Sequence, residues 1–280
     1  MYESFEKPLQ RLWQRGVKEF GSKWESEVLA SIQAMSGGYA MLGKSGHGGI
    51  DYGSLPAQAG YIYKYAPSRA ASIRDAMLDF ETRIDTTLLP TSGEIQIALV
   101  GGGPGSEIPG ILEFMSSSGF YEEVTEVHFE IFDRESKWQD VHELIIDAVD
   151  SSYAVTIEFT AFDALDRPEK GALVEFDLVA MSYIISELAK HASVSTIRKN
   201  LAALIGTMNK YAYLVYNDNK SYDFYKFMNS IVDFSALNQL HEFEYADSLP
   251  HPFTPAYVKA KIALDHSPHL SPKCLAKLIY

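Results

Sequence analysis

Residues 97–110 read Ile-Ala-Leu-Val-Gly-Gly-Gly-Pro-Gly-Ser-Glu-Ile-Pro-Gly, and this stretch decides the fold class. An apolar run typical of a buried strand ends in a glycine-rich turn, and a helical pattern follows at once. Glycine is favoured in such a turn because it adopts positive φ without strain and lets backbone N–H groups approach a ligand. A strand, a glycine turn and a helix in this order indicate the nucleotide- or cofactor-binding edge of an α/β sheet.

Beyond residue 90, strand patterns alternate with helical patterns. We expect strands at 95–100, 126–132, 153–159, 176–181 and 211–216, and helices at 107–117, 136–149, 194–208 and 221–232. Two late strands, at 241–245 and 275–280, are separated by a proline-rich stretch without a clear helix, which favours an antiparallel edge hairpin. Strands joined by crossover helices predict an α/β fold with a doubly wound, mostly parallel, seven-stranded sheet and an antiparallel last strand.

The first 90 residues predict a helical cap. Apolar residues recur at helical spacing across residues 5–35, where Gly16 and Gly21 leave one long helix and two shorter ones equally open. Residues 37–53 are glycine-rich and lack apolar periodicity, so we expect a loop that helps to cover the cofactor.

Two further helical patterns lie at 55–65 and 68–80, where a Pro-Ser step at 67–68 predicts a break followed by an N-cap. We therefore expect a cap or lid domain at 1–90 and a Rossmann-like domain at 91–280.

Composition limits the location and the partners. Residues 1–7 lack the basic and apolar regions of a secretory signal, no apolar run approaches the ~20 residues that span a bilayer, and Cys274 is the single cysteine. We expect a cytoplasmic protein with no membrane partner, and the histidines at 251, 266 and 269 lack the spacing of metal ligands. The formal net charge of −13 disfavours nucleic acid, because phosphate binding needs a basic surface.

Polar residues follow the strands at their carboxyl ends, where open α/β sheets bind ligands. Asp133 ends the second strand, Asp163 follows the third, Ser182 and Tyr183 follow the fourth, and Asn217-Asp218 follows the fifth. For Asp133 the alternative is a solvated acid or a helix N-cap, and for Asp163 it is a cap of the local turn. The five strand ends together predict one ligand site.

This series resembles the class I S-adenosylmethionine-dependent methyltransferases across about 93–280. Gly101, Gly103 and Gly105 match the glycine motif that lies under the methionine moiety, and Asp133 matches the acid that binds the ribose. The resemblance implies S-adenosylmethionine as cofactor, and a small molecule or a protein side chain as methyl acceptor.

The resemblance also implies the rest of the cofactor site. Asp163 matches the acid near the adenine, and residues 176–183 are similar to the fourth-strand motif that faces the methyl group. Trp138 is a candidate for packing against the adenine or, equally, in the core. The cofactor-binding residues predicted from the sheet domain are Gly101, Gly102, Gly103, Gly105, Asp133, Arg134, Trp138, Asp163, Ala164, Ser182 and Tyr183.

Two features depart from the family pattern. Leu99 stands where many members carry an acid, so the contact to the methionine amino group is expected from elsewhere, with the N-terminal cap as a candidate. No Asn/Asp-Pro-Pro-Tyr/Phe tetrapeptide follows the fourth strand, which argues against amino-methylation of nucleobases. Residues 61–67 and 177–188 are also similar to methyltransferase-like proteins of the mitochondrial small ribosomal subunit, without their cysteine cluster.

The cap contributes further candidates. Tyr61 and Tyr65 share a helix face one turn apart, and Arg69 has the planar fork that binds a carboxylate; the alternatives are core packing and an exposed charge. Glu187 and His191 are candidates for a general base, against a structural or solvated role.

Two other functions stay open. The chain could be a non-catalytic binding or assembly module, because Leu99 stands where many members carry an acid. It could also be a flavin or nicotinamide oxidoreductase, because the Val-Gly-Gly-Gly-Pro-Gly motif is similar to flavoprotein motifs. Flavoprotein motifs usually open the chain with an acid ~20 residues later, whereas Asp133 lies further from a motif that begins at Gly101.

Overall fold

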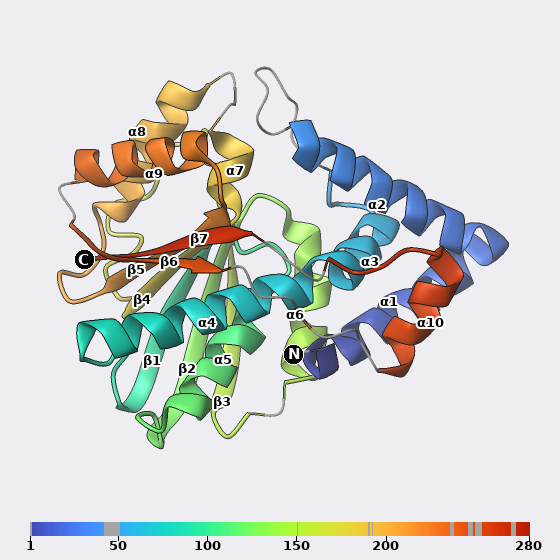
Figure 1. The fold of residues 1–280 in the computed structure, drawn as a ribbon, viewed down its shortest axis with the longest axis horizontal. Helices are drawn as coiled ribbons and strands as arrows, with labels where there is room; N and C mark the ends of the chain where they lie inside the picture. The colour runs from blue at the N-terminus through green and yellow to red at the C-terminus, as the bar shows by residue number, and fades with distance from the viewer. Residues whose placement is uncertain are drawn as a thin grey trace.

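The structure is a computed structural model that describes residues 2–41, 51–149, 151–189, 191, 193–235, 238–245, 249, 254–269 and 273–280. Within these ranges one seven-stranded sheet has the order β3-β2-β1-β4-β5-β7-β6 (Figure 1). Its strands are β1 (Ser92–Val100), β2 (Glu123–Asp133), β3 (Ala154–Ala161), β4 (Leu178–Ser182), β5 (Tyr213–Asn219), β6 (Gln239–Tyr245) and β7 (Cys274–Ile279). Neighbours among β1–β5 pair in parallel, and β7 is antiparallel to β5 and β6, which confirms the predicted fold class.

Helices cover both faces of this sheet. The helices within the sheet domain are α5 (Glu107–Ser118), η2 (Ser136–Trp138), α6 (Gln139–Ile146), α7 (Ile184–Leu188), α8 (Val194–Ile205) and α9 (Tyr222–Ser235). Along β1, Ile97 and Leu99 belong to the core under α5, while Ala98 and Val100 belong to the core under α8 and α9. Because strand side chains alternate between faces, a strand buried on both sides is apolar throughout.

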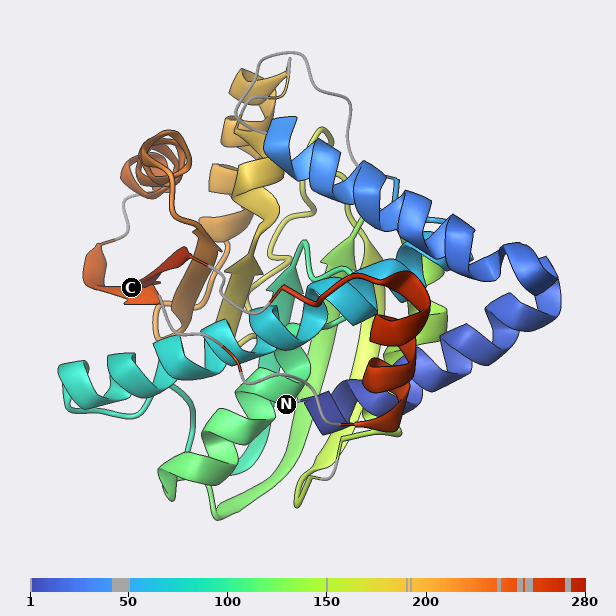
Figure 2. The same cartoon turned by 45° about the vertical axis from the view of Figure 1, so that its right-hand side comes forward.

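The N-terminal residues form α1 (Tyr2–Phe20), η1 (Gly21–Lys23), α2 (Trp24–Met41), α3 (Leu55–Lys64) and α4 (Ala66–Ile84). The structure has two helices where one or two were predicted, because Gly21 breaks the chain at φ 59°, and α1 and α2 form a V-shaped hairpin (Figure 2). A Cβ at Gly16 would lie 2.3 Å from the Trp24 ring, so the close packing of α1 against Trp24 requires a glycine at this position.

Two predictions in the cap were wrong in detail. The predicted loop at 37–53 begins later, because α2 continues to Met41; residues 42–50 lie outside the described residues. The predicted break is present but comes before the proline, since α3 ends at Lys64 and α4 begins at Ala66. Pro67 therefore lies in the first turn of α4, where no backbone N–H is needed. Ser68 is not an N-cap, since its Oγ donates to the Tyr65 carbonyl at 2.9 Å.

The proline-rich stretch between the last two strands was also predicted wrongly. It contains α10 (Pro255–Leu264), which begins with a proline in its first turn and packs on α1 and α2 through buried Tyr257, Ala260 and Leu264. On this side of the sheet β6 is the edge strand, and β7, with its buried Cys274, lies between β5 and β6.

The cap and the sheet share elements in space. From Ile73 onward, α4 buries Ile73, Met77 and Phe80 in the core of the sheet, and α10 belongs to the core of the cap. The predicted division at residue 90 stays a prediction. No helix in the described part of the chain has the length and apolar character to cross a bilayer.

Candidate functional site

The glycine turn after β1 has the positive-φ backbone that its sequence predicted. Gly101, Gly103 and Gly105 have φ values of 70°, 49° and 78°, where a side chain would be strained. A Cβ at Gly101 would lie 2.5 Å from the Cδ1 of Ile184, so the turn runs directly against α7. The Gly101 N–H donates to the Phe132 carbonyl at 2.7 Å, which ties the turn to the end of β2.

A pocket opens at the carboxyl ends of the strands, between the sheet and the cap. Thirteen residues predicted for the site line it: Tyr61, Arg69, Gly101, Gly103, Asp133, Arg134, Trp138, Asp163, Ala164, Ser182, Tyr183, Glu187 and His191. Residues that the sequence analysis did not single out complete the wall: Tyr52, Pro104, Phe132, Glu135, Phe162, Ile184 and Leu188. The parallel topology therefore brings the strand ends and part of the cap into one site.

Three predicted residues are placed off the pocket wall. A Cβ at Gly102 would meet the Leu99 Cβ at 2.8 Å, and one at Gly105 would meet the Ile108 Cδ1 at 2.8 Å, so both glycines allow close packing. Tyr65 is buried, with its Oη 2.9 Å from the Ser36 Oγ and its ring centroid 5.0 Å from that of Tyr39.

Asp133 braces the glycine turn. Its Oδ2 accepts the Gly103 N–H and its Oδ1 accepts the Glu135 N–H, both at 2.8 Å. Burial raises the pKa of this carboxyl, and the two backbone donors oppose the shift. His142 holds the other side of the turn, with Nε2 donating to the Gly103 carbonyl at 2.7 Å. Each Asp133 oxygen retains a lone pair, so the carboxylate can accept a further hydroxyl.

Asp163 and Trp138 both line the pocket and both also stabilise the structure around them. The Asp163 Oδ1 accepts the Leu165 N–H at 2.9 Å, so this residue does cap its turn, as the alternative interpretation held, and it also lines the pocket. Trp138 is 1% exposed and packs edge-on against Tyr61, with ring centroids 5.5 Å apart. Its indole therefore forms a fixed apolar wall.

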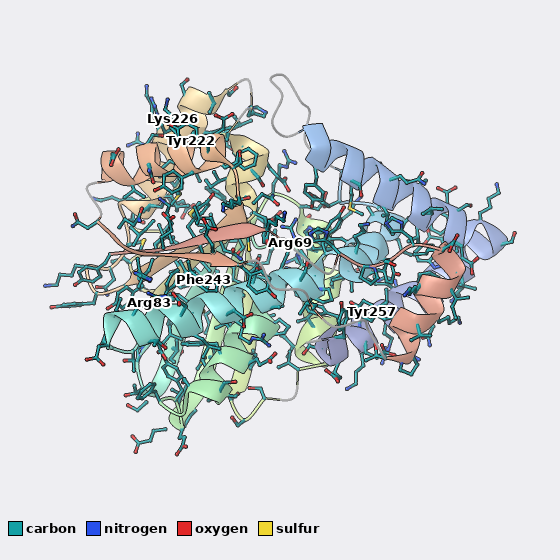
Figure 3. All side chains as sticks on the ribbon, viewed as in Figure 1. Arg69, Arg83, Tyr222, Lys226, Phe243 and Tyr257 are labelled. Carbon is teal, nitrogen blue, oxygen red and sulfur yellow. The ribbon has the colours of Figure 1, made fainter. Side chains whose placement is uncertain are left out.

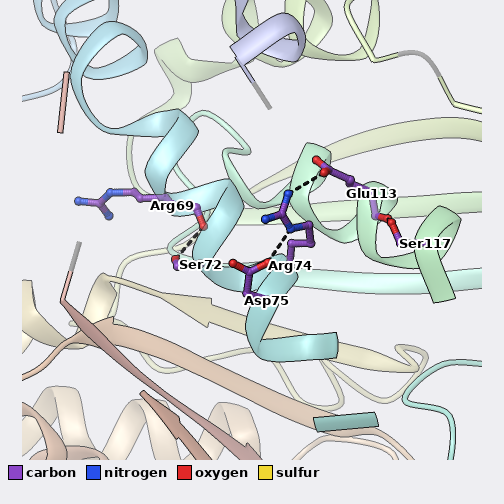
Figure 4. Close-up of polar contacts among 6 residues, drawn as sticks. All are labelled: Arg69, Ser72, Arg74, Asp75, Glu113 and Ser117. Carbon is purple, nitrogen blue, oxygen red and sulfur yellow. Dashed lines mark hydrogen bonds and ion pairs between the residues drawn. The ribbon is translucent and has the colours of Figure 1, made fainter. Parts of the chain in front are cut away.

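Arg69 is buried among aromatic rings at the centre of the molecule (Figure 3). Its guanidinium carbon lies 3.8, 5.2, 5.5 and 5.8 Å from the ring centroids of Tyr183, Tyr61, Tyr39 and Tyr65. The Nη2 donates to the Tyr39 Oη at 3.1 Å, and the guanidinium forms no ion pair with a described residue. Figure 4 shows it pointing away from Arg74, which pairs with Asp75 and Glu113. Arg69 thus keeps donors free for an anionic ligand.

Tyr183, beneath Arg69, has an unusual backbone. Its φ of 60° puts a bulky residue in the left-handed region, which costs about 1–3 kcal/mol. The Tyr183 Oη lies 3.5 Å from the Ser72 Oγ, which accepts from the Asn217 Nδ2 at 2.8 Å. These contacts hold the Tyr183 ring beside the guanidinium, 3.8 Å from the Arg69 Cζ to the ring centroid.

Glu187 ends a chain of hydrogen bonds that starts at Arg69. Arg69 donates to Tyr39, whose hydroxyl lies 2.8 Å from that of Tyr52, and Tyr52 donates to the Glu187 Oε1 at 2.7 Å. Burial raises the pKa of Glu187 to about 7, while the Tyr52 hydroxyl and Arg69 favour its charged form. Such a carboxylate accepts protons near neutral pH.

His191 also lines the pocket but its ring is oriented as a donor. The Nδ1 accepts the Ser193 N–H at 3.1 Å, so the neutral ring carries its proton on Nε2. Asp218 lies off the pocket wall and is fully buried, and its Oδ2 accepts the Ser186 N–H at 2.8 Å, which fixes α7. Of these strand-end candidates, Glu187 has the chemistry of a base.

Among the described residues, no three His, Cys, Asp or Glu side chains are placed to hold a metal ion. His251 lies outside those residues.

The comparisons with known proteins concern the fold. No protein-family model and no curated protein matches the sequence. A similar solved structure is the CMeT domain of the citrinin polyketide synthase, at 11% identity over 90% of this chain and 65% of that chain, with a TM-score of 0.48. This chain therefore spans less than two thirds of that one. A second is an S-adenosylmethionine-dependent methyltransferase from Clostridium acetobutylicum, at 8% identity over 74% and 90% of the two chains, with a TM-score of 0.45. A third is a solved structure described as the conversion of a disulfide bond into a thioacetal group during echinomycin biosynthesis. It shares 15% identity over 73% of this chain and 80% of that chain, with a TM-score of 0.44.

Proposed function

We propose that the chain is an S-adenosylmethionine-dependent methyltransferase that acts on a small molecule or a protein side chain. The observation that carries the proposal is the convergence of the glycine turn, Asp133, Asp163 and Arg69 on one pocket at the carboxyl edge of the sheet. When bound, this cofactor supplies a methyl group on a positively charged sulfur leaving group. The narrower likeness to mitochondrial ribosomal proteins stays a resemblance.

The residues present fit the parts of this cofactor. Asp133 has acceptors for ribose hydroxyls, and the wall formed by Phe132, Phe162 and Trp138 suits an adenine. Arg69, a buried cation without an ion pair among the described residues, suits the carboxylate of the methionine moiety. The Ser182 Oγ is buried at the pocket and has no hydrogen-bond partner among those residues, as expected of a group that meets a ligand.

The chain's own residues then do two things. The pocket wall holds the cofactor and the acceptor in line and excludes water, which is most of what methyl transfer requires. Glu187 takes the proton from an acceptor that arrives protonated, while Tyr52 orients its carboxylate.

Isothermal titration with S-adenosylmethionine and S-adenosylhomocysteine tests the proposal, with NAD and FAD as controls. Binding of the two sulfur nucleosides alone supports it. Binding of a control instead favours an oxidoreductase, and silence toward all four makes the glycine turn structural. A protein that binds the cofactor but transfers no methyl group to any component of a cell extract would be the non-catalytic module.

We expect Asp133→Ala to weaken S-adenosylhomocysteine binding about tenfold, because a ribose hydroxyl of the ligand loses its charged acceptor. The variant also loses the acceptor of the Gly103 and Glu135 N–H groups, so its melting temperature falls while its circular dichroism spectrum is retained. An unchanged dissociation constant in calorimetry would remove Asp133 from the cofactor site.

We expect Arg69→Met to lower the affinity for S-adenosylhomocysteine by about 2 kcal/mol, or roughly 30-fold, because the ligand carboxylate loses charged donors. Binding of 5′-methylthioadenosine, which lacks that carboxylate, stays the same. Arg74→Met is the matched control, since Arg74 lies on the same helix but pairs with Asp75 and Glu113. Equal losses for both ligands would mean that Arg69 only maintains the fold.

A further inference from the structure

Three buried polar atoms beside the glycine turn lack partners. The Ser106 Oγ, Glu107 Oε2 and Ser182 Oγ meet no described residue with hydrogen-bond geometry, and their side chains are 1%, 4% and 5% exposed. The Ser182 hydroxyl nevertheless favours the charged form of Glu107, and the Ser106 hydroxyl that of Tyr61. Ser106 and Glu107 lie where the turn passes into α5, and Ser182 ends the neighbouring β4. Because a buried polar atom without a partner is costly, such a group indicates a ligand or an ordered water.

Glu107 is the charged member of this group. The pKa of its carboxyl is raised to about 7, chiefly by burial and in small part by Asp133, against the opposing effects of its own backbone N–H, Arg69 and Ser182. From α3, Tyr61 also faces the carboxylate, which raises the pKa of the Tyr61 hydroxyl. Glu107 is not itself among the residues that line the pocket, but Tyr61, Arg69, Asp133 and Ser182, which act on its carboxyl, all are. It is therefore a buried acid beside the pocket wall, in a place where a cation would favour its charged form.

The position usually taken by an acid is not available here. Leu99 occupies it, and its side chain is 1% exposed and packed in the sheet core with Ile97 and Ile108. A negative charge for an ammonium group must come from another element. The first turn of α5 supplies one, since Glu107 follows the glycine turn directly.

Arg69 and Glu107 have opposite charges, both are buried, and they form no ion pair with each other. Two opposite buried charges that are left apart suit a ligand that carries both charges itself. We infer that Glu107 binds the α-ammonium group of an α-amino acid moiety whose carboxylate binds Arg69. This inference rests on the proposed function. It assigns the contact to the methionine amino group to α5, whereas the sequence analysis considered the N-terminal cap for that contact.

Titration of three ligands into the parent protein and Glu107→Gln tests the inference. The ligands are S-adenosylhomocysteine, its analogue without the amino group, and 5′-methylthioadenosine. We expect the parent to prefer S-adenosylhomocysteine over the deaminated analogue about tenfold, and the variant to bind both equally, because the ammonium loses one charged acceptor. The affinity for 5′-methylthioadenosine stays unchanged. Glu113→Gln, on the same helix but paired with Arg74 rather than facing Arg69, is the matched control and keeps the preference.

Thermal melting of the ligand-free proteins separates this role from a structural one. The folded-state pKa of Glu107 is raised, so the parent loses stability as pH rises from about 4.5 through about 7, whereas Glu107→Gln does not. The melting temperature of the variant relative to the parent therefore rises between pH 5.5 and pH 8. A variant that melts lower at pH 8, or that keeps the preference for the amino group, overturns the inference. If the parent binds none of the three ligands, the proposed function fails as well.

Discussion

Replacing Glu187 by Gln is expected to lower the methyl-transfer rate about 100-fold, because the pocket loses its proton acceptor near neutral pH. The parent rate should rise with pH and level off above about 7, the value to which burial raises the pKa of Glu187. The rate rises with pH because only the charged form of Glu187 can accept a proton. Release of S-adenosylhomocysteine, measured from pH 5.5 to 8.5 with an acceptor fraction of cell extract, gives both quantities.

The hydrogen bond from Tyr52 provides an independent readout. Because the Tyr52 hydroxyl favours the charged form of Glu187, Tyr52→Phe should move the midpoint of the pH profile upward. Glu143→Gln, on the exposed face of α6, is the control for a lost charge and should keep the parent profile. If Glu187→Gln keeps both the rate and the profile, the acceptor needs no base or another group supplies it.

The sheet could be predicted from the sequence because its signals are local. The apolar run at 97–100 and the glycines that follow specify a buried strand and a tight turn without reference to the rest of the chain. Asp133 and Asp163 were found for a topological reason, since the carboxyl ends of parallel strands meet at one edge. Phe132 and Phe162, one residue before these acids, carried the same positional signal and were missed.

The missed parts depend on tertiary packing. Pro255 suggested an irregular segment, but a proline in the first turn of a helix costs no hydrogen bond, and α10 is stabilised by burying Tyr257 against the cap. Tyr52 lies within the glycine-rich stretch at 37–53, which has no apolar periodicity, so nothing in the sequence linked it to Glu187. Glu107 has the pattern of an exposed acid at a helix start, and its burial comes from the packing of α5 against α4.

That packing rests on one glycine, and Gly110→Ala should be the most destabilising of the substitutions considered. A Cβ at Gly110 would lie 2.2 Å from the Ala70 carbonyl oxygen and 2.8 Å from the Ile73 Cγ2. The nearer atom belongs to the backbone of α4 and cannot rotate away, so the two helices must separate. We expect the free energy of unfolding in urea to fall by about 3 kcal/mol.

Gly37→Ala is the matched control, because Gly37 lies in α2 with no atom within 4 Å of the added Cβ. Alanine there should stabilise the helix by about 0.5–1 kcal/mol. Since Ala70 is next to Arg69, the shift of α4 in Gly110→Ala should also weaken S-adenosylhomocysteine binding, which the control retains. A Gly110→Ala protein as stable as the parent would show that α4 and α5 do not touch at their backbones, and the burial of Glu107 beside Arg69 would then need another cause.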